Sequence, residues 1–196
     1  MSEQSSRIVV GISGASGAAY AHSVLRQLAA LGAETHLVVS RAARLTAAYE
    51  MEEGFEYGPA AATYGINDVG APIASGSFRT RGMIITPCSV RTMSEIATGV
   101  TSTLLTRAAD VCLKEKRPLV LMVRETPFHL GHLRTMTQLA EMGAIIAPPL
   151  PALYAEPQSV QDIVDQSAAR CLELMGYETA ATRRWGEDVG PVGDDT

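Results

Sequence analysis

The sequence predicts an α/β fold with a mainly parallel sheet. Short apolar runs alternate with amphipathic stretches along the chain, and this alternation is typical of βαβ units. The first apolar run starts at Arg7 and ends in a turn with glycine at every third position, namely Gly11, Gly14 and Gly17. A strand, a glycine turn and a helix in that order aim several backbone N–H groups at one point, which suits an anion.

The first expected helix, at residues 16–31, follows this glycine turn. The glycine spacing differs from the dinucleotide fingerprint, and no Lys-Ser or Lys-Thr pair follows Gly17 as it does in a nucleotide-binding P-loop. Ser13 and Ser16 place hydroxyls beside the amides of the turn, where they suit a phosphate, a flavin edge or a helix N-cap. For Ser16 the N-cap and the ligand contact stay open as alternatives, and Ser13 receives no role of its own.

The remaining elements follow the same alternation. A second apolar run ends before Ser40, and further runs predict strands at 82–86, 118–123 and 144–147. Amphipathic periodicity predicts helices at 41–50, 89–97, 101–116, 128–142 and 159–176. Ser159 is a candidate N-cap of the last helix, with Asp162 completing a capping-box-like pair. Residues 52–80 and 148–154 are expected to be irregular.

Length and composition indicate a single domain that handles a small molecule. At 196 residues with 46% apolar composition, the chain can bury a proper core. We expect one domain over residues 1–196, with its core at about 7–176 and a tail at 177–196. The formal net charge is −5 and the basic cluster around Lys114 is isolated, so nucleic acid and an acidic membrane surface are not expected partners.

Cysteine usage and the chain ends predict a cytoplasmic protein. The three cysteines, Cys88, Cys112 and Cys171, share no metal-like or redox-pair spacing, which fits a reducing compartment. The first residues are polar, and no apolar stretch is long enough to span a bilayer. We therefore expect neither secretion nor membrane insertion.

The residues that follow the strands are the candidates for a functional site, because ligands of parallel sheets bind beyond the carboxyl ends of the strands. These residues are Gly14, Ala15, Ser16, Ser40, Pro87, Cys88, Ser89, Thr92, Arg124, Glu125 and the segment 148–154. An Arg-Glu pair at a strand end favours function over a solvated ion pair. Arg107, Lys114 and Arg170 lie on expected helices, where each alone is a surface charge unless all share one anion.

Several segments in order resemble the UbiX-type flavin prenyltransferases over about residues 7–176. They are GISGASG at 11–17, ASGS at 74–77, PCSVRT at 87–92, LLTRAADVCLKEKRPLVLMVRETP at 104–127, GAIIAPPLPALY at 143–154 and QSVQDIVD at 158–165. RRWGE at 183–187 resembles the tail of some members. The resemblance implies a flavodoxin-like, Rossmann-type three-layer sandwich. It also implies transfer of a dimethylallyl group from dimethylallyl monophosphate to reduced FMN, giving the prenylated FMN that UbiD-type decarboxylases use.

The resemblance also assigns residues to ligands. It implies that FMN contacts Gly14, Ala15, Ser16, Ser40, Ser89, Val90, Arg91, Thr92 and Arg124. It implies that the prenyl phosphate is held by Ser75, Arg107, Lys114, Arg124, Tyr154 and Arg170, some of them supplied by a neighbouring subunit. A homo-oligomer, as large as the dodecamer frequent in the family, is the corresponding expectation.

The chemistry implied by the resemblance needs a charge sink and a proton carrier. Clustered Arg and Lys side chains stabilise a leaving phosphate without a metal, and no Asp-rich pair of the magnesium-binding kind is found. Glu125 is the candidate acid/base, Ser16 a candidate relay and Glu50 a further candidate or a solvated helix end. The pair His129 and His132 is expected at a helix surface rather than on a metal.

Two features leave alternatives open. Some relatives carry an aromatic residue where this chain has Val69 and Gly70, so the exact prenyl donor, monophosphate or diphosphate, is not fixed. Cys88 is expected to be a small buried residue rather than a nucleophile. The competing functions are an FMN-dependent decarboxylase of the cysteine decarboxylase type, whose catalytic His is missing from RAARLTAAYE at 41–50, and a non-catalytic FMN carrier for a decarboxylase.

Overall fold

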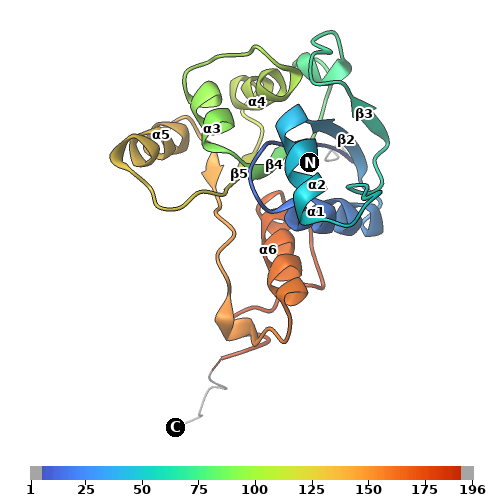
Figure 1. Ribbon diagram of the computed structural model, residues 1–196, viewed down its shortest axis with the longest axis vertical. Coiled ribbons are helices and arrows are strands. Elements are labelled where there is room, and N and C mark those ends of the chain that lie inside the picture. The colour runs from blue at the N-terminus through green and yellow to red at the C-terminus, as the bar shows by residue number, and fades with distance from the viewer. Residues whose placement is uncertain (1–5, 191–196) are drawn as a thin grey trace.

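A parallel sheet between layers of helices forms the body of the molecule (Figure 1), in a computed structural model that describes residues 6–190. The strands are β1 (Arg7–Ile12), β2 (Glu34–Val39), β3 (Ala62–Tyr64), β4 (Met83–Cys88), β5 (Leu119–Val123) and β6 (Ile145–Ile146). Their order across the sheet is β3-β2-β1-β4-β5-β6, and every described pair is parallel. This is the Rossmann order, whose direction reverses between β1 and β4. The predicted α/β class is confirmed.

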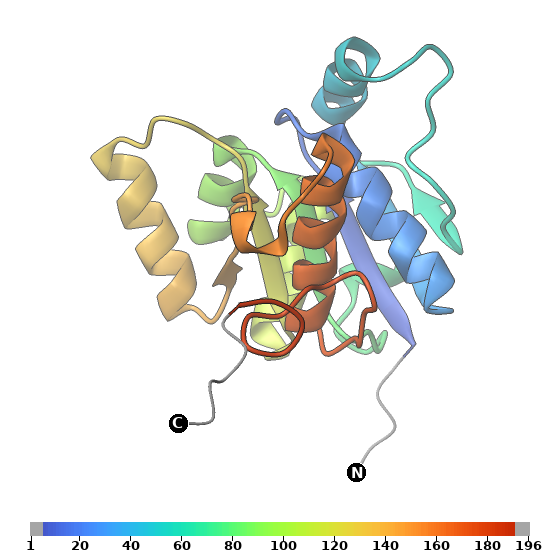
Figure 2. The same ribbon diagram turned by 90° about the horizontal axis from the view of Figure 1, so that it is seen from below.

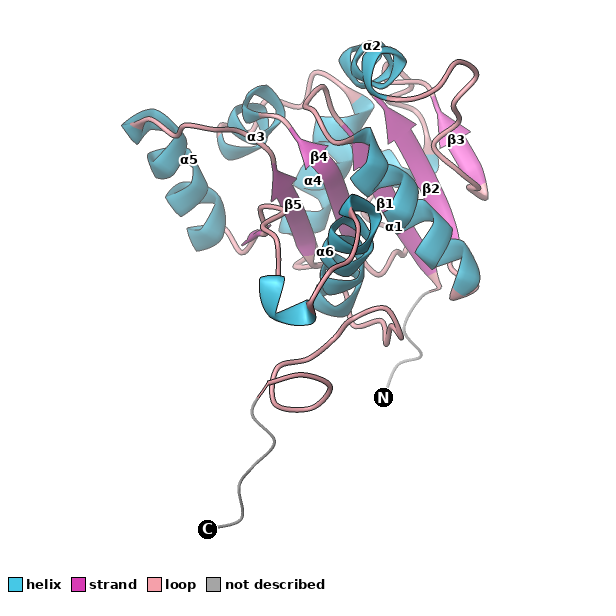
Figure 3. Cartoon of the chain, turned by 60° about the horizontal axis from the view of Figure 1, so that its bottom comes forward, coloured by secondary structure: helices cyan, strands magenta, loops and turns pink. Residues whose placement is uncertain are grey.

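Helices cover both faces of the sheet (Figures 2 and 3). They are α1 (Ala18–Ala30), α2 (Arg41–Glu50), α3 (Val90–Ala97), α4 (Leu104–Lys114), α5 (Leu130–Glu141) and α6 (Val160–Leu174). Alternate strand residues point to opposite faces, so Ile8 and Val10 pack with α1 and α6 whereas Val9 packs with α3 and α4. Two apolar cores result, one on each side of strands that are buried on both faces.

The predicted helices are all found, and five of the six strands of the described sheet match predicted apolar runs. β3 lies inside the segment 52–80, which the sequence predicts to be irregular, so that part of the prediction is wrong. The strand is three residues long and occupies the sheet edge, where it pairs with β2 alone. Its order comes from that pairing with β2, which a local apolar pattern does not reveal.

Of the two N-cap residues that the sequence predicts for α1 and α6, the structure confirms one. The start of α6 is confirmed, because Ser159 Oγ accepts from the Asp162 N–H at 3.1 Å and Asp162 accepts from the Ser159 N–H at 3.0 Å. The N-cap role of Ser16 is wrong, since α1 begins at Ala18 and its N-cap is Gly17. Gly17 has a φ of +115°, a conformation that favours glycine. The Ser16 hydroxyl is thereby released from capping α1.

The chain after α6 is irregular but attached. Arg184 donates to Glu173 of α6 at 2.6 Å, and Arg183 donates to the Ala155 carbonyl at 2.6 Å. Within residues 6–190, every helix is too short or too polar to cross a bilayer.

Candidate functional site

A cavity of about 520 Å³ opens beyond the carboxyl ends of β1, β2, β4 and β5, at the point where the strand order reverses. Its volume lies in the usual range of small-molecule sites. All nine residues expected at a flavin line it, together with Glu125: Gly14, Ala15, Ser16, Ser40, Ser89, Val90, Arg91, Thr92 and Arg124. The convergence of these strand ends is therefore observed.

Part of the lining comes from segments that the sequence did not connect with the site. These residues are Arg41, Ala42, Ile66, Asn67, Glu95, Thr103, Leu105 and Thr106. The Ile66 carbonyl accepts from the Leu104 N–H at 2.8 Å, which joins the loop after β3 to the start of α4. The Thr103 and Thr106 hydroxyls form a capping box, and Thr103, a preferred N-cap residue type, was the sequence signal for this helix start.

Three helices begin at this cavity. α2 follows Ser40, whose Oγ accepts from the Ala43 N–H at 3.0 Å, and α3 follows Ser89, whose Oγ accepts from the Thr92 N–H at 3.3 Å. α4 follows Thr103 in the same way. A helix N-terminus carries partial positive charge and unpaired amides. The cavity therefore suits an anionic group on its ligand.

The N-terminus of α1 is already taken by Glu50 at the end of α2. Its Oε2 accepts from the Gly17 and Ala18 N–H groups at 2.8 and 2.9 Å. The anion held by the first amides of α1 thus belongs to the chain itself. A ligand phosphate at these two amides would meet the Glu50 carboxylate.

The same contacts fix the charge of Glu50. Burial alone would raise its pKa, but hydrogen bonds from the Ser16 side chain and from the Ala18 and Gly17 amides, with the nearby Arg124 charge, outweigh it and hold the pKa below the ordinary value. Glu50 is therefore ionised at neutral pH and is not a proton donor in the resting protein. It does not line the cavity itself, and it adjoins the cavity through Ser16.

Arg124 and Glu125 directly follow β5 and line the cavity. The Arg124 N–H donates to the Cys88 carbonyl at 3.0 Å, which ties β5 to β4. Within residues 6–190 its guanidinium has neither a hydrogen bond nor a salt bridge. Glu125 is half-buried, and its carboxylate accepts from the adjacent Thr126 N–H at 3.0 Å. Arg124 and Glu125 thus place a cation and a carboxylate side by side in the cavity lining.

The glycine turn lies against the first turn of α2. A Cβ built on Gly14 would stand 2.3 Å from the Ala42 Cβ, much closer than two such atoms approach. Glycine at this position lets the turn and α2 form adjacent walls of the cavity.

The residues expected at the prenyl phosphate do not gather at this cavity within one chain. Arg107 pairs with Asp110 at 2.8 Å, Lys114 pairs with Glu115, and both lie beside the segment around Ser75 and Gly76. Taken within one chain, each is a helix charge with a local carboxylate partner.

Tyr154 and Arg170 form a second group. They line a separate cavity of about 140 Å³ between the 147–154 segment and α6. Arg170 pairs with Glu173 at 3.1 Å, and the Tyr154 ring meets the Trp185 ring edge-on with centroids 5.8 Å apart. Of the expected phosphate ligands, Arg124 alone lines the cavity at the strand ends in the described chain.

His129 and His132 lie at the start of α5, and Cys88 lies at the end of β4. His129 is the N-cap of α5 and accepts from the Gly131 N–H at 3.0 Å, with the His132 ring 3.6 Å away. Among residues 6–190, no group of three His, Cys, Asp or Glu side chains is arranged to hold a metal ion. Cys88 is fully buried, and burial raises the pKa of its thiol to about 12. Its assignment as a buried structural residue is confirmed.

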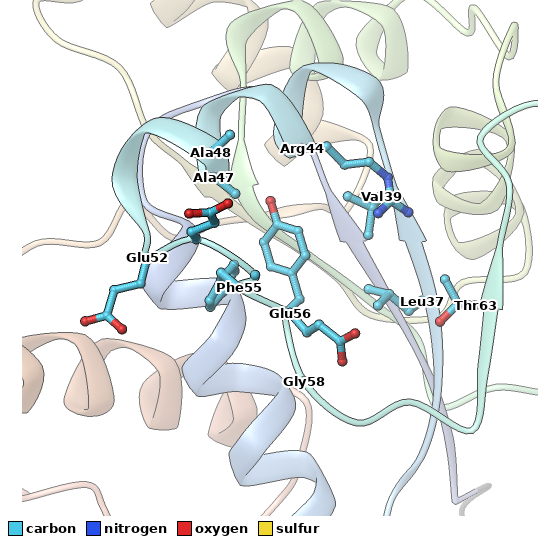
Figure 4. Close-up of a pocket in the computed structure, with 13 residues that line it drawn as sticks. Leu37, Val39, Arg44, Ala47, Ala48, Glu52, Phe55, Glu56, Gly58 and Thr63 are labelled. Carbon is cyan, nitrogen blue, oxygen red and sulfur yellow. The ribbon is translucent and has the colours of Figure 1, made fainter.

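A larger hollow of about 600 Å³ lies elsewhere, between α2, the following loop and strands β2 and β3 (Figure 4). Arg44 of α2 faces it, as do the carboxylates Glu52, Glu53 and Glu56 of the loop. The hollow is not lined by the start of any of the three helices that begin at the strand-end cavity. With more carboxylates than cations, it is unsuited to a phosphate.

The chain resembles known flavoproteins. The sequence family described as Flavoprotein matches residues 1–172. The flavin prenyltransferase UbiX of Thauera aromatica is 52% identical over 91% of this chain and 93% of its own length. The crystal structure of AnUbiX in complex with FMN and dimethylallyl pyrophosphate superposes with a TM-score of 0.88 at 44% identity, covering 94% of this chain and 98% of that one. A dodecameric FMN-dependent UbiX-like decarboxylase from Escherichia coli O157:H7 superposes with a TM-score of 0.84 at 40% identity, over 91% and 98% of the two chains.

Proposed function

The chain belongs to the UbiX flavin prenyltransferase family, and from this premise we propose that it joins a dimethylallyl group from dimethylallyl monophosphate to reduced FMN. At 52% identity over 91% of the chain, it is a flavin prenyltransferase rather than a cysteine decarboxylase or a non-catalytic carrier. The product, prenylated FMN, is passed to a UbiD-type decarboxylase. The main support from geometry is one cavity lined by every residue expected at the flavin.

The chemistry of the cavity fits FMN. The three helix starts and the free Arg124 charge favour a phosphate monoester, and the apolar side chains of Ile66, Val90 and Leu105 offer surface to a ring system. The neighbour AnUbiX was solved with FMN. Bound reduced FMN supplies the nucleophilic nitrogen and carbon to which the prenyl group is joined.

The donor phosphate site is proposed to be completed by another copy of the chain. Arg124 lines the flavin cavity, but the other expected phosphate ligands lie in two other places of the same chain. One group is Lys114, Arg107 and Ser75, and the other is Tyr154 and Arg170. Oligomer formation brings such distant surfaces together, and the dodecameric relative supports an oligomer. Cations from two copies then share the charge of the departing phosphate, which makes the reaction independent of a metal.

Two carboxylates have separate roles in this proposal. Glu125 is the acid/base, because its carboxylate lines the cavity beside Arg124 and is engaged by its own neighbouring amide alone among the described contacts. Glu50 is ionised and hydrogen-bonded to Ser16, so it accepts a proton through the Ser16 hydroxyl or orients that hydroxyl toward the flavin. Ser40 keeps its O–H proton for the ligand, since its Oγ accepts from Ala43.

The cellular setting follows from the same proposal. All three cysteines are buried free thiols, which supports a reducing, cytoplasmic compartment.

Two measurements test the proposal: which flavin or nucleotide the protein binds, and which arginine that binding needs. Protein denatured after purification or after loading should release FMN rather than FAD or NAD. Arg124→Ala should weaken FMN binding by roughly tenfold or more, as expected for loss of one charge-assisted contact. The matched control is Arg44→Ala, which removes the arginine of the larger hollow and should bind FMN as the wild type does. Release of a dinucleotide alone, or an effect confined to Arg44→Ala, would contradict the proposal.

A further inference from the structure

Ser13 is the first residue after β1 and is 1% exposed. Its backbone N–H donates to the Pro87 carbonyl at 3.2 Å, and its Oγ donates to the same carbonyl at 3.0 Å. The same Oγ accepts from the Ser89 N–H at 2.8 Å. One buried hydroxyl therefore joins the end of β1 to the segment that begins α3.

These hydrogen bonds extend the parallel ladder between β1 and β4, with the Ser13 hydroxyl in place of a backbone carbonyl. Backbone pairing between β1 and β4 ends at Gly11 and Ile85. In a parallel ladder, a residue donates its N–H to one carbonyl of the neighbouring strand and accepts at its own carbonyl from an amide two residues further along. Ser13 donates to Pro87 and accepts from Ser89, two residues on, but accepts through its hydroxyl.

The backbone carbonyl of Ser13, which would otherwise accept from the Ser89 N–H, makes a different hydrogen bond. It accepts from the Ala15 N–H at 2.9 Å and so starts the glycine turn. With a backbone carbonyl alone, the chain could either continue the ladder with Ser89 or bend into the turn. The side chain of Ser13 allows both at once, which a residue without a hydroxyl at this position does not.

The neighbouring strand ends are joined through the backbone. The Ser40 N–H donates to the Ile12 carbonyl at 2.9 Å, and the Arg124 N–H donates to the Cys88 carbonyl at 3.0 Å. The connection made by Ser13 crosses the boundary between β1 and β4, where the strand order reverses and ligands bind. Both segments that it joins, 14–16 and 89–92, line the cavity.

We propose that Ser13 is a positioning residue for the flavin, which sets the distance between the glycine turn and the start of α3. The inference rests on the proposed FMN site. Without the hydroxyl, the Ser89 N–H loses its partner, and the two walls of the cavity are no longer held in one arrangement. Ser13 acts through these walls and does not itself line the cavity.

The test compares Ser13→Ala, Ser13→Thr and the matched control Thr86→Val. Thr86 is a fully buried residue of β4 whose hydroxyl donates to the Met122 sulfur at 2.9 Å, and it does not line the cavity. FMN is titrated into each protein while its visible spectrum is recorded, and melting temperatures are measured without flavin. Ser13→Ala should bind FMN roughly tenfold more weakly, the effect of one lost hydrogen bond, with an altered spectrum of the bound flavin. Ser13→Thr, which keeps the hydroxyl, should restore both.

The control separates positioning from stability. Thr86→Val should lower the melting temperature about as much as Ser13→Ala and leave FMN affinity and spectrum unchanged. Equal FMN binding by wild type and Ser13→Ala, or equal weakening by Thr86→Val, would overturn the inference. Should Ser13→Ala not accumulate as folded protein, Ser13→Cys, with a weaker hydrogen-bonding group, must give the weakened binding instead. Failure of the wild type itself to bind FMN would contradict the proposed function, which is a distinct outcome.

Discussion

Glu50 and Ser13 each make side-chain hydrogen bonds to residues far away in the sequence. Glu50 ends α2, yet its carboxylate binds Gly17 and Ala18 at the start of α1. In Rossmann folds that bind dinucleotides, this helix start receives the pyrophosphate. Here the chain fills that position with its own carboxylate, and the proposed site places the ligand's phosphate at the starts of α2, α3 and α4 instead.

The depressed pKa of Glu50 predicts a pH dependence of stability. The folded pKa lies below the ordinary value of 4.5, so the contribution of Glu50 is present above that value and is lost as pH falls through the folded pKa. Glu50→Gln removes the negative charge at the α1 start. The difference in melting temperature between wild type and Glu50→Gln should be largest near neutral pH and should shrink in acid. A difference that stays constant across this range would contradict the assignment.

At this scale, the sequence predicts residues at strand ends well and distant contacts poorly. The cavity-lining residues Ser40, Ser89 and Arg124 follow strands directly, so local pattern and the strand-end rule were sufficient. Glu50 meets Gly17 across 33 positions of the chain, and Ser13 meets Ser89 across 76. Contacts of this kind depend on how helices and strands pack, which no local pattern contains.

Among the elements, the glycine turn and α2 depend on each other. Gly14 approaches Ala42 so closely that a Cβ would stand 2.3 Å from the alanine methyl. The turn and the first residues of α2 are adjacent walls of the cavity. A side chain at residue 14 therefore has to push one wall away from the other.

Gly14→Ala should accordingly weaken FMN binding while the protein stays folded. Gly65→Ala is the matched control, because a Cβ there meets nothing within 4 Å. In the double variant Gly14→Ala/Ala42→Gly, the clash between methyl groups is removed, and FMN affinity should recover in part, since the backbone of residue 42 still lies 3.2 to 3.3 Å from the new Cβ. FMN titrations of the four proteins provide the measurement. Undiminished affinity in Gly14→Ala would show that the walls are not coupled.

Element prediction succeeded where periodicity is strong and failed where pairing dominates. α2 spans Arg41–Glu50 as expected, and the capping pair at Ser159 correctly marks the start of α6. Helix starts and apolar strands are set by neighbouring residues. β3 was missed because its three residues are ordered by their pairing with β2.

At the scale of the whole molecule, the residues of the proposed flavin site share one cavity, whereas those of the proposed donor site lie apart. Lys114 and Arg170 lie away from Arg124 in two different parts of the chain. The family resemblance implies that these cations act as a set, but it does not indicate which copy of the chain supplies each one. Assembly into an oligomer supplies the missing proximity in the proposed enzyme.

Substitutions and the mixing of variant subunits test whether two copies of the chain share the donor site. Lys114→Ala and Arg170→Ala should each weaken dimethylallyl monophosphate binding by about 1.5–3 kcal/mol, the usual loss for a charge-assisted contact, with FMN binding unchanged. Arg134→Ala, which removes an exposed charge of α5, is the control. Oligomers reassembled from Lys114→Ala and Glu125→Gln subunits should regain activity that neither variant has alone, because some sites then combine two intact halves. No recovery on mixing would place all donor contacts within one chain.

The central claim is that this chain forms the prenyl–flavin bonds without a metal. The direct measurement is mass spectrometry of the flavin after anaerobic incubation of the protein with reduced FMN and dimethylallyl monophosphate, with a chelator present. We predict a flavin heavier by one five-carbon unit, and a rate lowered roughly 10²–10⁴-fold in Glu125→Gln if that carboxylate carries the proton. Glu52→Gln, which alters a carboxylate of the larger hollow, should keep the wild-type rate. Wild-type protein that binds both ligands and yields unmodified FMN would contradict the account.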